Sequence, residues 1–128
     1  MEQIKKVLII EDDTFLQGLA AGKLVKSGYD VSTAGNIEQA EKALDELTPD
    51  VIILDLVLPG GSDGFGILKK IRESSKTKDT PVIIFSNLAE AKDMEQAKAL
   101  GANEFMVKSN FTLDELVEKI ASLTTPKE

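Results

Sequence analysis

The stretch VIILDLVLPGG, residues 51–61, sets one carboxylate into a run of branched apolar residues. The four apolar residues 51–54 are typical of a strand that is covered on both faces of a parallel sheet. Asp55 follows them directly, and a Pro-Gly-Gly turn begins at Pro59. An apolar strand gains no packing from an acid at its end, so we expect Asp55 to have a chemical role.

The same kind of stretch recurs along the chain. Short β-branched runs are followed, about five times, by longer stretches with helical spacing, and this alternation predicts an α/β fold with a parallel sheet. The predicted strands are residues 7–10, 31–33, 51–54, 82–85 and 105–107.

Helix starts are marked by capping residues. Three of them place a capping side chain three residues before a Glu or Gln, as in a capping box: Thr14 with Gln17, Asn36 with Gln39, and Thr112 with Glu115. The helices that follow have apolar faces, formed by Leu16, Leu19, Ala20 and Leu24, by Ile37, Ala40, Ala43, Leu44 and Leu47, and by Leu113, Leu116, Val117, Ile120 and Leu123. Two further helices are expected at about residues 65–73 and 89–100, the second with a narrow apolar face.

Composition limits the possible functions. A chain of 128 residues that is 42% hydrophobic and 29% charged predicts a single globular domain, residues 1–128. No apolar run approaches the roughly 18 residues of a membrane span, and MEQIKKVLII lacks the pattern of a signal peptide. We therefore expect a cytoplasmic protein with no membrane contact.

The chain contains no cysteine and no histidine. These absences exclude disulfides, cysteine-based metal sites, a Ser-His-Asp triad and a phosphohistidine on this chain. The net charge of −7 disfavours direct binding to nucleic acid. Carboxylates, hydroxyls, amides and lysines remain for chemistry, with proteins, small ligands or cations as partners.

Polar side chains follow four of the predicted strands. Because parallel strands end at the same edge of a sheet, and ligands bind there, these residues are expected to gather at one rim: Glu11, Asp12 and Asp13 after the first strand, Asp55 after the third, Ser86 and Asn87 after the fourth, and Lys108 and Ser109 after the fifth.

The acids at this rim predict a magnesium site. If the first and third strands are neighbours, about 4.8 Å apart, Asp55 lies close to Glu11 and Asp12. Like charges at that distance disfavour ionisation unless a cation lies among them, and all-oxygen ligands favour Mg²⁺. Lys108 is long enough to reach a phosphate bound there, and Ser86 could donate a hydrogen bond to it.

Each of these signals also has a purely structural interpretation. Acids after a strand often occupy the first turn of a helix, where they interact favourably with its dipole. A lysine at a strand end and a serine in a loop are usually solvated. The conjunction of all four at matching strand ends favours a functional site.

These pieces resemble the receiver domain of two-component response regulators, over about residues 4–123. The matching stretches are LIIEDD (8–13), IILDLVLPGGSDG (52–64), VIIFSN (82–87) and GANEFMVK (101–108). The resemblance implies a single doubly wound (βα)5 domain, a flavodoxin-like three-layer sandwich with a five-stranded parallel sheet in the order 2-1-3-4-5.

The resemblance also implies roles for the acids. Asp55 would be the nucleophile that accepts a phosphoryl group from a partner's phosphohistidine. Mg²⁺ would be held by Glu11, Asp12, Asp55 and the backbone carbonyl of Val57. Asp13 would cap the first helix rather than bind the metal.

The remaining roles concern the phosphoryl group and the switch. Ser86 would donate a hydrogen bond to the phosphoryl group, Lys108 would pair with it, and Phe105 stands where the family usually has an aromatic switch residue. The partners implied are a histidine kinase or histidine phosphotransfer protein and a downstream protein target, with the chain a monomer or weak dimer.

Four positions depart from the family pattern. Ser109 stands where a proline in a cis bond is usual after the lysine, and Asn87 stands where a small residue is common. The turn at residues 60–63 is one residue longer than the commonest form, and Glu11 replaces an aspartate.

The leading hypothesis is a phosphorylation-dependent switch in a phosphorelay, not an enzyme beyond its own phosphorylation and dephosphorylation. Two alternatives stay open: a degenerate receiver that binds partners constitutively, and a small Mg²⁺-dependent aspartyl-phosphate phosphatase. The second is disfavoured because such enzymes carry another acid two residues after the nucleophile, where this chain has Val57. No effector domain is expected after residue 123, whether the protein acts alone or is part of a larger regulator or hybrid kinase.

Overall fold

The chain alternates between strands and helices along its whole described length. The computed structural model describes residues 4–58 and 64–124. Its elements are β1 (Lys6–Ile10), α1 (Thr14–Lys26), β2 (Asp30–Ala34), α2 (Ile37–Glu46), β3 (Val51–Leu54), α3 (Gly64–Glu73), β4 (Val82–Ser86), α4 (Ala91–Ala99), β5 (Glu104–Val107), a short 3-10 helix (Lys108–Asn110) and α5 (Leu113–Thr124). The predicted strands are confirmed to within one residue at their ends.

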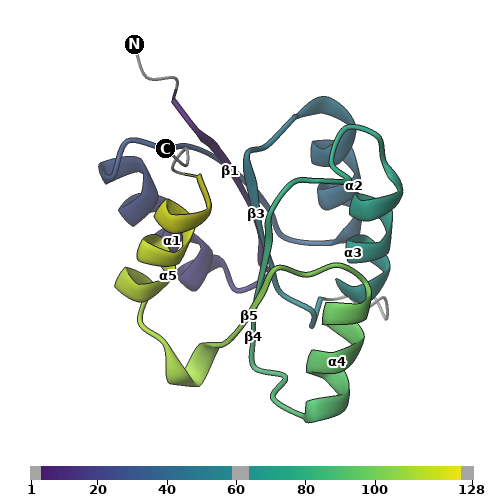
Figure 1. Cartoon of the computed structure of the whole chain (residues 1–128). Coiled ribbons are helices and arrows are strands. Elements are labelled where there is room, and N and C mark those ends of the chain that lie inside the picture. Colours follow the sequence, from purple (N-terminus) through teal and green to yellow (C-terminus); the bar gives the residue numbers. More distant parts are fainter. Residues whose placement is uncertain (1–3, 59–63, 125–128) are drawn as a thin grey trace.

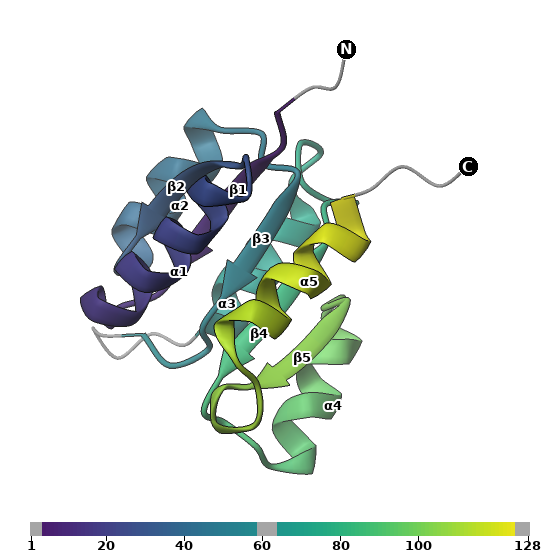
Figure 2. The same cartoon turned by 90° about the vertical axis from the view of Figure 1, so that its left-hand side faces the viewer.

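The five strands form one parallel sheet in the order β2-β1-β3-β4-β5. Helices α1 and α5 cover one face, and α2, α3 and α4 cover the other (Figures 1 and 2). This arrangement confirms the doubly wound, flavodoxin-like sandwich in three layers. None of the helices in the described part of the chain combines the length and apolarity that crossing a bilayer requires.

Two apolar cores fill the spaces between the layers. Leu8 and Ile10 face the α2, α3 and α4 side, whereas Val7 and Ile9 pack with α1 and α5. The central strand β3 is buried along its whole length, which explains its uninterrupted apolar sequence. Each large aliphatic side chain buried in this way stabilises the fold by about 1.5–3 kcal/mol. The sheet is therefore a rigid base for the residues at its ends.

Two details of α1 differ from the prediction. The N-cap is Asp13, whose Oδ1 accepts a hydrogen bond from the Leu16 amide at 3.1 Å, so the predicted cap Thr14 was wrong by one residue. Aspartate is the stronger capping residue of the two. Leu19, predicted to lie on the buried face, is 46% exposed. The packed face of α1 is narrower than the sequence indicated, and centres on Ala20 and Leu24.

The other two predicted caps are confirmed. The side chain of Asn36 accepts a hydrogen bond from the Gln39 amide at 2.8 Å. Thr112 and Glu115 form a reciprocal capping box, with distances of 2.9 and 3.1 Å. These two bonds satisfy amides that a helix start otherwise leaves unpaired.

Helix α4 is held mainly at its C-terminal end. Ala97 is its one buried residue among those described, and its N-cap Glu90 makes no capping bond with its side chain. The narrow apolar face predicted for this helix is confirmed. The chain then turns at Gly101, whose φ of 101° is in the region that favours glycine.

Arg72 of α3 fastens the loops at the amino ends of β4 and β5. Its guanidinium donates to the Gly101 carbonyl at 2.8 and 3.0 Å, to the Thr77 carbonyl at 3.0 Å and to Asn103 Oδ1 at 2.9 Å. Asn103 Oδ1 also accepts from the Val82 amide at 2.8 Å. Burial lowers the pKa of Arg72, but a guanidinium remains charged at any physiological pH.

Candidate functional site

The site lies at the carboxyl ends of β1, β3 and β4, where the sheet register aligns the polar residues. Ile10 pairs with Leu54, so Glu11 and Asp55 both follow the last paired residues of neighbouring strands. The Asp55 amide donates to the Ile10 carbonyl at 2.9 Å, which extends the ladder and holds the Asp55 backbone in place. The predicted neighbourhood of β1 and β3 is therefore confirmed.

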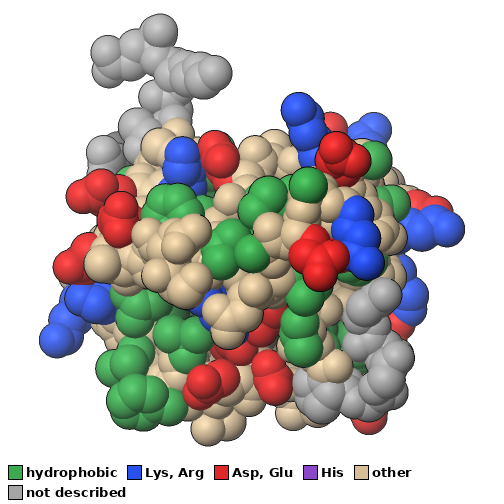
Figure 3. Space-filling model, turned by 90° about the horizontal axis from the view of Figure 1, so that it is seen from below, with side chains coloured by type: hydrophobic (Ala, Val, Ile, Leu, Met, Phe, Trp, Pro, Cys, Tyr) green, Lys and Arg blue, Asp and Glu red, His purple; other side chains and the backbone are tan. Residues whose placement is uncertain are grey.

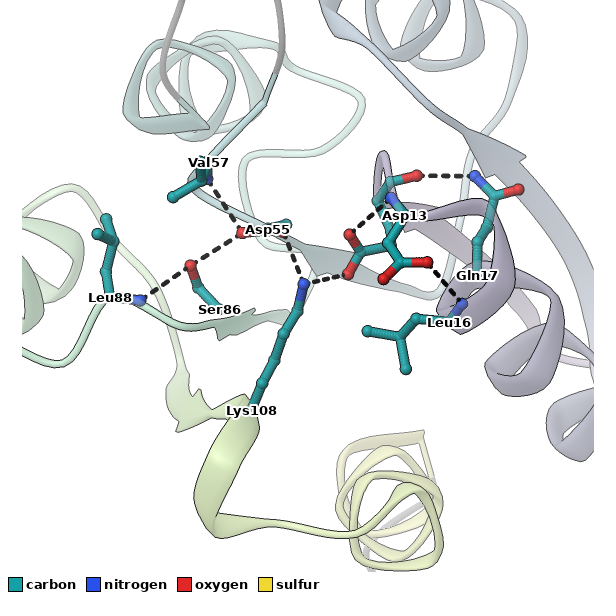
Figure 4. A network of polar contacts seen from close by, with 9 residues as sticks. Asp13, Leu16, Gln17, Asp55, Val57, Ser86, Leu88 and Lys108 are labelled. Atoms are coloured by element: carbon teal, nitrogen blue, oxygen red, sulfur yellow. Dashed lines mark hydrogen bonds and ion pairs between the residues drawn. The ribbon is translucent and has the colours of Figure 1, made fainter.

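Asp55 is only 4% exposed, and both of its carboxylate oxygens are bonded. Oδ1 accepts from the Val57 amide at 3.0 Å and from Ser86 Oγ at 2.8 Å, while Oδ2 accepts from Lys108 Nζ at 2.8 Å (Figure 4). Three elements thus aim donors at one buried carboxylate.

Lys108 also bridges to Glu11. Its ammonium lies 2.6 Å from Glu11 Oε1, and Glu11 Oε2 accepts from the Asp13 amide at 3.1 Å. Burial raises the pKa of Glu11 from its usual 4.5 to about 7, although the contact with Lys108 opposes this shift. Burial would lower the pKa of Lys108, but its hydrogen bonds to Asp55 and Glu11 outweigh it and raise that pKa. Lys108 is thus a fixed cation between two buried acids.

The acids enclose a place for a hard cation. Carboxylate oxygens of Glu11, Asp12 and Asp55 lie within 4.8 Å of one another, close to the distance of about 4.2 Å between opposite ligands of an octahedral Mg²⁺. They border a cavity of about 260 Å³, here called the strand-end hollow, which is lined by Glu11, Asp12, Asp13, Asp55, Val57, Asn87 and Lys108. Figure 3 shows one group of acidic side chains near the lower centre of the face seen there, and others spread around it. The donor set suits Mg²⁺ as predicted.

Other predicted residues take distinct places around the hollow. Asp12 is exposed, whereas Ser86 is fully buried. Asp13 caps α1 as the resemblance implied. Val57 contacts Asp55 through its amide, and metal binding by its carbonyl stays a prediction. Phe105 is half-buried and packs against the core on the α4 side.

Three of the four departures from the family pattern, at Glu11, Asn87 and Ser109, fall within the described residues. Ser109 lies in the 3-10 turn Lys108–Asn110, and no cis peptide bond occurs among the described residues. Asn87 is exposed and lines the strand-end hollow. The longer turn at residues 60–63 falls outside the described residues.

Two supporting residues were missed. Gly64 begins α3 against the backbone of Asp55: a Cβ there would lie 2.6 Å from the Asp55 carbonyl oxygen. Gln17, interpreted as part of a capping box, instead donates from Nε2 to the Glu11 carbonyl at 2.9 Å. The one available signal for Gly64 was its place at the start of a helix. Glycine is a poor helix former, so a glycine at this position indicates that another part of the backbone passes close by.

Comparison with known proteins agrees with this geometry. A family model described as a response regulator receiver domain matches residues 7–121. The transcriptional regulatory protein KdpE of Staphylococcus aureus is 40% identical over 115 residues, which cover 90% of this chain and 48% of KdpE. The phosphate regulon regulator PhoB of Escherichia coli is 30% identical over 119 residues, 93% of this chain and 51% of PhoB. The chain spans about half the length of these relatives.

Solved structures give the same result. The chemotaxis response regulator CheY4 of Vibrio cholerae superposes with a TM-score of 0.86 at 27% identity, covering 94% of this chain and 99% of that one. The phosphorylated cyanobacterial phytochrome response regulator RcpA superposes with a TM-score of 0.83 at 25% identity, covering 95% and 94%. Fold and sequence comparisons thus select the same group of proteins.

Proposed function

Because the chain belongs to the response regulator receiver family, we propose that it accepts a phosphoryl group on Asp55 from a partner's phosphohistidine and acts as a switch in a phosphorelay. The observation that carries this proposal is the buried Asp55 carboxylate with its three donors, at 2.8, 2.8 and 3.0 Å. The donor histidine must lie outside these 128 residues, which contain none, and a histidine kinase or histidine phosphotransfer protein would supply it.

The transfer follows from these contacts. A carboxylate oxygen of Asp55 attacks phosphorus, the phosphorus–nitrogen bond to the donor histidine breaks, and the imidazole keeps the bonding electrons. The transition state is loose, so charge neutralisation and positioning supply most of the catalysis. Lys108 offers a positive charge at the acceptor oxygen, and Ser86 can turn its hydroxyl from Asp55 to the incoming phosphoryl oxygen. Bound at Glu11, Asp12 and Asp55, Mg²⁺ would neutralise further charge.

The switch would pass from the site to α4 and β5. Ser86 closes β4, and the Leu88 amide donates to its hydroxyl at 3.4 Å, so a turn of Ser86 releases the loop that leads to α4. Phe105 and Leu88, which lies in this loop, both pack against the same apolar core. Helix α4 comes directly after this loop and can follow it, because Ala97 is its one buried residue among those described. Its new position would change affinity for a downstream protein target.

Relatives support the signalling role and leave the target open. KdpE and PhoB are named as transcriptional regulators, and this chain matches only half of each; RcpA was crystallised in its phosphorylated form. We propose that this receiver itself contacts proteins rather than nucleic acid, because its net charge of −7 repels a phosphate backbone.

We also propose that catalysis by the chain is confined to its own phosphorylation and dephosphorylation. The residue two positions after Asp55 is Val57, which is 54% exposed at the hollow. An aspartyl-phosphate phosphatase would need a second acid there.

Incubation with acetyl phosphate and Mg²⁺ tests the proposal. The intact chain should gain the mass of one phosphate, and Asp55→Asn should gain none. Asp45→Asn, a change at an exposed position of α2, is the matched control and should be labelled like the wild type. Labelling that persists in Asp55→Asn would refute the assignment of the acceptor.

A further inference from the structure

Asn87 stands out among the residues that line the strand-end hollow. It follows Ser86 directly and is exposed. Its side-chain amide has no hydrogen-bond partner among the described residues. It is also the one neutral amide among the described residues that line the hollow. This polar side chain thus lies beside the site without a polar contact to the described part of the chain.

The other polar groups at the hollow already have tasks. Glu11 and Asp55 are tied to Lys108, and the Asp13 carboxylate caps α1. Asp12 completes the group of acids that suits a cation. The amide of Asn87 therefore remains available for a molecule that enters the hollow from solvent.

Hydrolysis of an acyl phosphate on Asp55 needs such a molecule. Water must attack phosphorus on the side opposite the Asp55 oxygen, and this side faces the open hollow because Asp55 itself is buried beneath it. An amide side chain that orients the attacking water is a recurring device in phosphoryl transfer. Its carbonyl oxygen can accept a hydrogen bond from that water.

We propose, building on phosphorylation of Asp55, that the Asn87 amide positions the hydrolytic water and so sets the lifetime of the phosphorylated state. The water oxygen bonds to phosphorus, and the phosphorus–oxygen bond to Asp55 breaks. Asp55 leaves as a carboxylate, and the proton of the water passes to solvent. Inorganic phosphate is the product, and no other reactant is needed.

The test compares decay rates of the phosphorylated chain. Wild type, Asn87→Ala and Asn87→Gln are labelled with acetyl phosphate and Mg²⁺ and freed of the donor, and release of inorganic phosphate is then followed at constant excess Mg²⁺. Loss of a water-positioning contact should slow the decay of Asn87→Ala about tenfold. Asn87→Gln, which retains an amide, should recover part of the rate.

Asn110→Ala is the matched control, because Asn110 is exposed in the same rim but does not line the hollow; its decay should equal that of the wild type. Decay of Asn87→Ala at or above the wild-type rate would overturn this inference alone. Failure of Asn87→Ala to be labelled would overturn it too, by showing that the amide serves the transfer instead. Failure of the wild type to be labelled would refute the proposed function itself.

Discussion

Replacing Lys108 with methionine removes the cation that the structure places between Asp55 and Glu11 while preserving most of the apolar stem. Both carboxylates are only 4% exposed. Removing one partner of a buried charge pair costs about 3–5 kcal/mol. Asp55 retains the donors from Val57 and Ser86, and Glu11 can take up a proton because its pKa is about 7. We therefore expect a loss at the lower end, about 3 kcal/mol of unfolding free energy in the absence of Mg²⁺.

The loss should depend on pH with a definite sign. The folded-state pKa of Glu11 already lies above its usual 4.5, at about 7, so the folded chain binds more protons than the unfolded chain and its stability falls as pH rises through this window. Without Lys108 the pKa of Glu11 should rise further, so the stability of Lys108→Met should continue to fall above pH 7. The stability of the wild type levels off there. The difference in unfolding free energy between the two chains should therefore be larger at pH 8 than at pH 6.

Although Lys108→Met should be less stable, its affinity for Mg²⁺ should be higher than that of the wild type. A divalent ion and an ammonium about 4 Å apart repel by about 2 kcal/mol even in water, so Lys108→Met should bind Mg²⁺ at least about tenfold more tightly. Urea unfolding and titration calorimetry measure the two effects.

The matched control is Lys119→Met, which breaks an ion pair with Glu104 whose two side chains are 37% and 39% exposed. It should cost less than about 1 kcal/mol and leave Mg²⁺ binding unchanged. The reasoning would be refuted if Lys108→Met matched this control in both stability and Mg²⁺ affinity.

Three further predictions follow from other contacts. Because the pKa of Glu11 is about 7, protons should compete with Mg²⁺ for this carboxylate. The metal should therefore bind about tenfold more weakly at pH 6 than at pH 8. Glu11→Gln should abolish this pH dependence, and a pH dependence that persists in the variant would exclude Glu11 as its cause. Gly64→Ala, whose Cβ would lie 2.6 Å from the Asp55 carbonyl oxygen, should cost about 1–3 kcal/mol and slow Asp55 phosphorylation; wild-type stability and labelling would contradict the close approach. Arg72→Ala removes the hydrogen bonds to three acceptors and leaves the part-buried Gly101 carbonyl without its two donors, so it should lower the unfolding free energy by about 3 kcal/mol. Lys69→Ala on the exposed face of α3 should change it by less than about 0.5 kcal/mol, and equal unfolding midpoints would argue against the role given to Arg72.

The sequence was sufficient for the sheet and for the convergence of the site. A strand covered on both faces must be apolar throughout, so β3 and β4 were recognisable from composition alone. Parallel strands end at one edge, so the sequence alone predicted that Glu11, Asp55 and Lys108 lie close together. These predictions succeeded because each depends on one pattern, apolar periodicity.

Contacts with the backbone were harder to predict. Arg72 bonds to carbonyl oxygens of residues 77 and 101, and carbonyl oxygens have no side-chain signature. Gly64 is needed because the Asp55 backbone passes close by, which depends on tertiary packing. The predicted cap of α1 was Thr14, and the observed cap is Asp13. Both residues have a side-chain oxygen that can accept the capping bond, and the local backbone conformation decides which of them does.

The fastening by Arg72 has a consequence for how this domain can evolve. It ties the loops at the amino ends of β4 and β5, while the acids, the hydroxyl and the lysine lie at the carboxyl ends. Substitutions of Arg72 therefore act on these loops from the edge of the sheet opposite the strand-end hollow. Selection can adjust the stability of this edge at positions that do not touch the hollow, whereas positions such as Lys108 and Gly64 link stability to the site itself.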